Sequence, residues 1–134
     1  MIDPKWIGLP YVDKGRGPDG WDCWGLVRAI LAEHGVTLPD YADTYTAADD
    51  RASACAAVEA GLRDGWERVE RPRALDLLIL NIARRPWHCG LMVGPTLFVH
   101  APPNGTSRIE RIDAPQWARR KEGYYRHESM QGWP

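Results

Sequence analysis

A cysteine at the start of a predicted helix is the residue of this sequence best suited to nucleophilic chemistry. Cys23 follows the turn-forming run Gly-Pro-Asp-Gly-Trp-Asp and opens a segment whose apolar residues recur at helical spacing. A thiol reacts as its thiolate, and the positive end of a helix or a nearby imidazolium lowers its pKa. The backbone N–H of such a residue can also stabilise an oxyanion. Free cysteines are often buried and inert, so position alone leaves a packing role open.

Two histidines could supply the base that a catalytic cysteine needs. His88 begins one short apolar run and His100 ends the next. The residues between them include Val-Gly-Pro-Thr-Leu at 93–97, which predicts a tight hairpin that would place the two imidazoles side by side. One ring could then take the proton of Cys23 while the other orients it. Taken alone, two histidines at strand ends fit a structural role equally well.

The other imidazoles and thiols have simpler interpretations. His34 lies at the end of the predicted helix and His127 in a polar tail, where we expect structural roles. Cys55 lies in an Ala-rich segment and is predicted to pack. Cys89 adjoins His88 and could be a rival nucleophile or a metal ligand. Because successive strand residues face opposite ways, we expect Cys89 in the core.

A zinc site is an alternative use of the same groups. Cys23, His88 and His100 could act as three ligands and leave the fourth position to water. The sequence has no pair of ligands at metal-binding spacing, and its three cysteines are too irregularly spaced for a disulfide framework. We therefore expect neither a metal nor another cofactor.

The elements that must position these residues follow from periodicity. Residues 22–34 predict a helix with Asp22 as its N-cap, and residues 47–62 predict a second, Ala-rich helix. The polar tail predicts a solvated face with a closing strand, and less readily a docking surface. Five β-prone runs precede it, at 66–69, 77–80, 89–93, 97–100 and 108–112. Helices followed by strands predict an α+β domain, with N-terminal helices packed on an antiparallel β-sheet.

Composition excludes several classes of function. With 134 residues, 44% of them apolar and 26% charged, we expect residues 1–134 to form one globular domain. The formal net charge of −1, without a basic cluster, predicts no nucleic-acid partner, and no apolar run is long enough for membrane insertion. The first residues lack the basic start and apolar run of a secretory signal peptide, so we expect synthesis in the cytoplasm.

Three short blocks resemble those of a known family of enzymes. Residues 22–27, Asp-Cys-Trp-Gly-Leu-Val, resemble the Asp-Cys-Ser-Gly-Leu-Val block of the NlpC/P60 peptidases. Residues 88–94, His-Cys-Gly-Leu-Met-Val-Gly, resemble that family's His-Val-Gly-Ile-Tyr-x-Gly block, and residues 98–101 resemble its (Ile/Val)-His-Ala block. Tyr11 lies where the family has a tyrosine, about a dozen residues before the nucleophile. The order and spacing agree, and the resemblance covers roughly residues 5–112.

The resemblance implies a fold, a reaction and a set of site residues. It implies a papain-like fold in which Cys23 is the nucleophile, His88 the base, His100 the residue that orients His88, and Tyr11 a hydroxyl donor near the thiol. It also implies an endopeptidase that cuts peptidoglycan stem peptides at a bond of the D-glutamyl–diamino acid type, through a thioester acyl-enzyme. Bacterial peptidoglycan is then the partner of the active site.

Departures from the family pattern point to a particular branch. Trp24 replaces the usual Ser, so we expect it to shape the wall of a substrate groove together with Asp22 and Trp87. The family's Gly-Asp before a strand appears here as Leu75-Asp76. The block with Trp resembles proteins of phage tails and gene transfer agents, which implies tail-tip or hub proteins as partners and a protein carried to the wall by a particle.

Two other functions stay open at this stage. If Trp24 crowds the groove, the chain could be a catalytically weak or inactive tail protein that binds the wall or serves assembly. If the chemistry is retained on another substrate, the chain would be an amidase or an acyltransferase.

Overall fold

The computed structural model describes residues 2–41, 60–63, 65–82, 85–103 and 105–130, without the side chains of residues 82 and 85–87. The Ala-rich segment at 47–62, for which the sequence predicts a helix, lies almost wholly outside the described residues, and so does Cys55. No helix within the described ranges has the length and apolar character that a membrane span requires.

The first helix begins and ends as the sequence predicts. α1 (Cys23–Glu33) is capped by Asp22, whose Oδ1 accepts a hydrogen bond from Gly25 N at 2.7 Å. It ends at the C-cap His34, which is followed by Gly35 at a φ of 85°. One face of α1 is buried. Burial of each aliphatic side chain on this face stabilises the folded state by about 1.5–3 kcal/mol. These residues are Leu26, Val27, Ile30 and Leu31.

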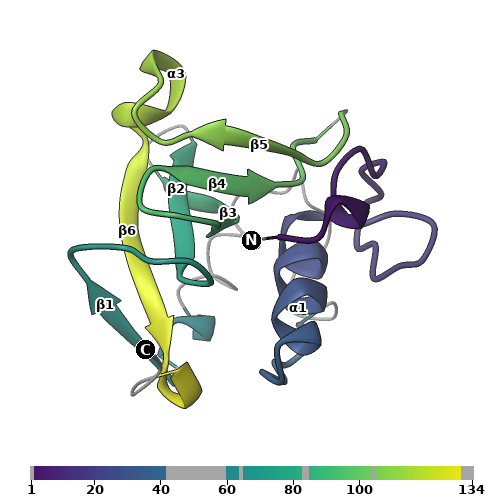
Figure 1. Cartoon of the computed structure of the whole chain (residues 1–134), viewed down its shortest axis with the longest axis horizontal. Coiled ribbons are helices and arrows are strands. Elements are labelled where there is room, and N and C mark those ends of the chain that lie inside the picture. Colours follow the sequence, from purple (N-terminus) through teal and green to yellow (C-terminus); the bar gives the residue numbers. More distant parts are fainter. Residues whose placement is uncertain (1, 42–59, 64, 83–84, 104, 131–134) are drawn as a thin grey trace.

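All five predicted strands are present in one antiparallel sheet, and a sixth strand joins them (Figure 1). Their order across the sheet is β1-β6-β2-β3-β4-β5. β2 and β3 are longer than predicted, because their pairing continues past a bulge at Leu80/Asn81 to Ile82 and Arg85. The strands are β1 (Trp66–Val69), β2 (Leu77–Ile82), β3 (Arg85–Met92), β4 (Leu97–His100), β5 (Arg108–Arg111) and β6 (Lys121–His127).

The predicted closing strand is confirmed, but it lies inside the sheet. β6 pairs with β1 on one side and with β2 on the other. Arg126 of β6 donates two hydrogen bonds, of 2.9 and 2.7 Å, to the buried carboxylate of Asp76. Asp76 follows Leu75, whose φ of 77° lies in the left-handed region that favours glycine. Glycine adopts a positive φ without steric cost, which explains why the family that the sequence blocks resemble has Gly before this Asp.

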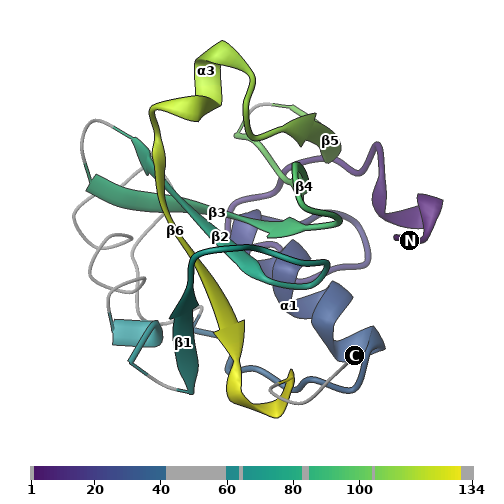
Figure 2. The ribbon, with the colours of Figure 1, turned by 60° about the vertical axis from the view of Figure 1, so that its left-hand side comes forward.

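The hairpin between β3 and β4 forms as predicted. Val93 N donates a hydrogen bond to Leu97 O at 2.9 Å, and Leu91 of β3 lies opposite Val99 of β4. A short helix, α3 (Pro115–Ala118), connects β5 to β6. Figures 1 and 2 show α1 lying alongside the sheet and α3 beyond the ends of β5 and β6.

The sheet has a core on each face. α1 packs on the first face, where its buried residues meet one set of alternate strand residues: Leu77, Ile79, Cys89, Leu91, Val99 and Tyr125. The other face holds the intervening residues Leu78, Leu80, Met92, Phe98 and Tyr124, with Ile112 from the segment before α3. Trp117 of α3 covers this second core edge-on, with its ring centroid 5.8 Å from that of Phe98.

The N-terminal segment contacts both ends of α1 and the residue that precedes β5. It begins with a 3-10 turn, η1 (Pro4–Trp6), where the Trp6 indole N–H donates to Glu33 at 2.9 Å. The chain then runs beside Ser107, with Gly8 N and Ser107 O 2.8 Å apart, and returns through Trp21 to the start of α1. A second 3-10 turn, η3 (Glu128–Met130), follows β6.

Candidate active site

Cys23 is the first residue of α1 and is half-buried. Its side chain forms hydrogen bonds with the side chains of Cys89 and His88, which are neighbours on β3. The bond with Cys89 and then the bond and charge of His88 hold the pKa of the Cys23 thiol well below its ordinary range, although burial acts in the opposite direction. Such a thiol ionises readily, as a nucleophilic cysteine must.

His88 and His100 lie side by side, as the hairpin predicts. Nε2 of His88 is 2.8 Å from Nδ1 of His100, and the two rings are close to perpendicular at 74°. His88 is 4% exposed and His100 is fully buried. The structure therefore brings together the sulfur and the two imidazoles that the sequence singles out.

The line of contacts continues to Glu110 on β5. Oε2 of Glu110 is 2.5 Å from Nε2 of His100, and the carboxylate also accepts hydrogen bonds from Trp117 at 3.0 Å and Arg108 at 3.2 Å. Burial raises the pKa of Glu110, but the bonds from Trp117, His100 and Arg108 outweigh it and lower the pKa to about 2. Glu110 is thus ionised at neutral pH.

These contacts determine where the ring protons lie. Burial and the charge of nearby His88 lower the pKa of His100 to about 4, although Glu110 acts in the opposite direction, so at neutral pH His100 carries one proton. An ionised carboxylate only accepts, so that proton lies on Nε2, and Nδ1 of His100 accepts from Nε2–H of His88. The nitrogen left to His88 for Cys23 is Nδ1.

The glycines of the two main sequence blocks permit close backbone approaches. A Cβ on Gly25 would lie 2.1 Å from Gly15 O, so only glycine lets the N-terminal segment rest on the first turn of α1. A Cβ on Gly90 would lie 2.9 Å from Val99 O and 3.3 Å from the Cβ of His100. Gly90 therefore lets β4 pack closely against β3 beside the histidine pair.

Asp22 is buried, contrary to the prediction that it lines a groove. It is 1% exposed, because its carboxylate accepts hydrogen bonds from Gly25 N and, at 2.8 Å, from Arg16 Nη1. Arg16 also donates to Asp40 at 3.0 Å. Asp22 thus caps α1 and ties its start to Arg16, so its contribution to the site is to hold the turn that carries Cys23.

The other residues that the sequence predicts for the site are Trp24, Tyr11 and Trp87. Trp24 is half-buried, donates its indole N–H to Pro39 O at 3.0 Å, and has its ring 5.5 Å from that of Tyr41. Tyr11 is half-buried and packs against the same core cluster as Cys23. Trp87 belongs to β3, but its side chain lies outside the described residues.

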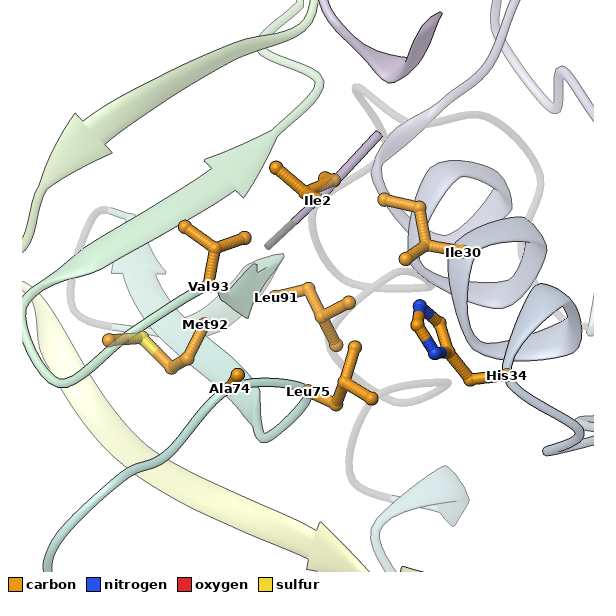
Figure 3. A pocket seen from close by; sticks show the side chains of 8 residues that line it. All are labelled: Ile2, Ile30, His34, Ala74, Leu75, Leu91, Met92 and Val93. Carbon is orange, nitrogen blue, oxygen red and sulfur yellow. The ribbon is translucent and has the colours of Figure 1, made fainter. Parts of the chain in front are cut away.

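A hollow lies at the C-terminal end of α1, away from Cys23 (Figure 3). Figure 3 shows the His34 ring near Ile30 and Leu75, among otherwise apolar side chains. The sequence predicts a structural role for His34, and its place as the C-cap of α1 is consistent with that. None of the groups that face Cys23 lines this hollow.

Three features of the site escaped the sequence analysis. Glu110 belongs to no recognisable sequence block, and only the pairing of β4 with β5 brings it to His100. Arg16 lies in a run of turn residues that gives no sign of an ion pair. Cys89 is buried as predicted, at 3% exposed, yet it contacts Cys23. Within the described ranges, no group of three or more His, Cys, Asp and Glu side chains is arranged to hold a metal ion.

This chain resembles two curated proteins in sequence. It is 29% identical to Protein P54 of Enterococcus faecium over 113 residues, which are 84% of this chain and 19% of that protein. It is 25% identical to the probable endopeptidase p60 of Listeria innocua over 122 residues, which are 91% of this chain and 23% of that protein. The chain thus spans about a fifth of the length of these relatives.

A solved structure of similar size shows the same fold. The NlpC/p60 domain of the peptidoglycan hydrolase SagA superposes with a TM-score of 0.61 at 24% identity, covering 91% of this chain and 90% of that domain. The expected mixed α and β fold with an antiparallel sheet is therefore confirmed. The sequence model of the NlpC/P60 family matches residues 8–126, and this chain therefore belongs to the NlpC/P60 family.

Proposed function

We propose that this chain is a cysteine peptidase that cleaves bacterial peptidoglycan, with Cys23 as nucleophile and His88 as base. The observation that carries the proposal is the placement of the Cys23 thiol at the start of α1, where it is hydrogen-bonded to His88, which is in turn hydrogen-bonded to His100. His100 and Glu110 position the His88 ring, and Tyr11 contributes a hydroxyl near the thiol. Relatives described as an endopeptidase and a peptidoglycan hydrolase support the choice of substrate.

The proposed reaction uses the tautomers that the hydrogen bonds impose. His88 Nδ1 takes the thiol proton, and the Cys23 thiolate attacks the amide carbonyl, whose oxygen is stabilised by the Cys23 backbone N–H at the helix start. His88 then protonates the leaving amine, the C–N bond breaks, and a thioester remains. Water, deprotonated by His88, hydrolyses the thioester and regenerates the thiol.

The finer parts of the proposal rest on the resemblance of the sequence blocks. We propose a D-glutamyl–diamino acid bond as the bond that is cut, residues 1–134 as one catalytic domain, and no cofactor. The Trp-containing block supports a place in the tail of a phage or gene transfer agent, where hub or tip proteins would carry the domain to the wall.

The experiment that tests the activity is digestion of purified peptidoglycan with mass spectrometry of the released fragments. We expect the wild-type protein to release fragments with a new amino terminus on the diamino acid, and Cys23→Ala and His88→Ala to release none. His34→Ala is the matched histidine control, because this residue caps the far end of α1 and should leave hydrolysis unchanged. Undiminished hydrolysis by Cys23→Ala would contradict the proposal.

A catalytically weak wall-binding protein is the second candidate function, and the anchored indole of Trp24 is the observation that supports it. Because Pro39 and Tyr41 hold the indole in place, Trp24 does not simply rotate away from the start of α1. If the indole obstructs the groove, Trp24→Ser should turn a binding protein into a measurable hydrolase. If wild type and Trp24→Ser both bind peptidoglycan in sedimentation assays and neither cleaves it, the weak-binder function replaces the peptidase.

A further inference from the structure

A second thiol lies directly against the candidate nucleophile. Cys89 and His88 are neighbours on β3 and so face opposite sides of the sheet. Cys89 belongs to the core beneath α1, whereas His88 is hydrogen-bonded to His100, which packs against Phe98 of the second core. Cys23, at the tip of α1, packs against the core cluster that contains Cys89, and its side chain forms hydrogen bonds with both neighbours.

The hydrogen bond between the two sulfurs, burial and nearby charges together determine which sulfur keeps its proton. Cys89 is 3% exposed, whereas Cys23 is half-buried at the helix start. The bond with Cys23, burial, and the charges of Cys23 and Asp22 all raise the pKa of Cys89, and only Arg16 acts in the opposite direction. The pKa of Cys23 is lowered by Cys89 and by His88. Cys89 is therefore the S–H donor and Cys23 the acceptor when Cys23 is ionised.

We propose that Cys89 is a positioning residue for Cys23, whose buried S–H donates a hydrogen bond that stabilises the Cys23 thiolate and holds its sulfur over β3. The Cys89 backbone also forms a hydrogen bond with the same sulfur. His88 then approaches the sulfur from the other side of the strand. The thiolate is thus held from two directions, and only the His88 side exchanges a proton during the reaction.

This inference rests on the proposed function for its catalytic meaning, but it can be tested without any hydrolysis. The two thiols are compared in a Cys55→Ala background, so that no third cysteine contributes to the signal. In that background, Cys89→Val and Cys89→Ala remove the donor, while Cys89→Ser replaces it with a hydroxyl of similar size. The rate of alkylation of Cys23 by iodoacetamide is measured between pH 4 and pH 9, and mass spectrometry locates the label.

We expect the midpoint of alkylation to rise by about one pH unit in Cys89→Val and Cys89→Ala, a tenfold smaller thiolate fraction below the midpoint. In Cys89→Ser the midpoint should stay near that of the parent, because the hydroxyl restores the hydrogen bond. Thermal melts identify any variant that does not fold, and Cys89→Ala then stands in for Cys89→Val. A merely structural role would change the melting temperature and leave the midpoint in place.

Two results would overturn the inference: equal midpoints in all of the folded variants, or a Cys89→Ser midpoint shifted as far as that of Cys89→Val. The outcome is separable from the peptidase proposal. A shifted midpoint in a protein that never cleaves peptidoglycan would retain the role of Cys89 and reject the peptidase. If the parent protein cleaves peptidoglycan and its Cys89 variants show no shift of the midpoint, the peptidase proposal is retained and the role of Cys89 is rejected.

Discussion

Glu110 accepts a hydrogen bond from Nε2 of His100 across 2.5 Å, from the strand next to the one that carries His100. This contact ends a line that begins at the Cys23 sulfur and passes through His88 and His100. Because Glu110 is charged and His100 is neutral at neutral pH, the line has one consistent set of proton positions. Each ring donates away from Cys23, which leaves Nδ1 of His88 as the basic atom.

Substitution of Glu110 should weaken catalysis through the orientation of His88. In Glu110→Gln the amide oxygen can still accept from His100 Nε2–H, so we expect kcat to fall less than in Glu110→Ala. For Glu110→Ala, loss of a hydrogen bond to a charged group predicts a fall in kcat of about 10-fold to 100-fold. Steady-state hydrolysis of a stem-peptide substrate measures both. A Glu110→Ala variant with wild-type kcat would show that Glu110 does not position His88.

His100 should make the protein less stable as the pH falls. Its pKa is lowered from 6.5 to about 4 in the folded state, so between these values the unfolded chain binds a proton that the folded chain does not. The stabilisation is fully present above pH 6.5 and is lost progressively down to about pH 4. The shift corresponds to about 3 kcal/mol in the free energy of unfolding.

Urea unfolding at a series of pH values checks this prediction. His100→Asn is the matched variant, because its amide can still accept from His88 while having no group that titrates in this range. We expect the decline of unfolding free energy between pH 7 and pH 4.5 to be shallower in His100→Asn than in the wild type. Parallel declines in the two proteins would mean that His100 is not the group responsible.

Asp22 should stabilise the protein through its cap and its ion pair. Asp22→Asn keeps an oxygen for Gly25 N but loses the charge that faces Arg16, whereas Asp22→Ala loses both. We expect Asp22→Ala to lower the free energy of unfolding by about 1–3 kcal/mol, since a cap is lost and a half-buried Arg16 loses one of its partners. Asp22→Asn should fall between wild type and Asp22→Ala in chemical denaturation. Equal stability of Asp22→Ala and wild type would contradict a stabilising role for the cap and the ion pair.

Local patterns predicted the helix and strands of the described residues well, because caps, apolar spacing and turn residues act over a few neighbouring residues. The Asp22 cap and the apolar spacing after it defined α1, β-prone runs between turn residues defined five strands, and the turn residues at 93–97 defined the hairpin that joins β3 and β4. The position of β6 between β1 and β2 was not predictable, because it depends on pairing between residues far apart in the chain.

The site was predictable only where its residues belong to recognisable blocks. Cys23, His88 and His100 lie in such blocks. Glu110 lies in an ordinary strand and reaches His100 only because Phe98 lies opposite Glu110 in the β4–β5 register, which places the two side chains diagonally. Strand alternation correctly predicted that Cys89 and His88 lie on opposite faces of the sheet. It did not predict that the start of α1, with Cys23, packs against the face that holds Cys89.

The placement of β6 has a consequence for how the protein is made. During synthesis the helix with Cys23 and the strands with His88, His100 and Glu110 leave the ribosome before β6 does, since β6 spans Lys121–His127. Until then β1 and β2 have no strand between them, and Asp76 lacks the guanidinium that neutralises it. A nascent chain therefore carries Cys23, His88, His100 and Glu110 on an incomplete sheet until β6 has been translated.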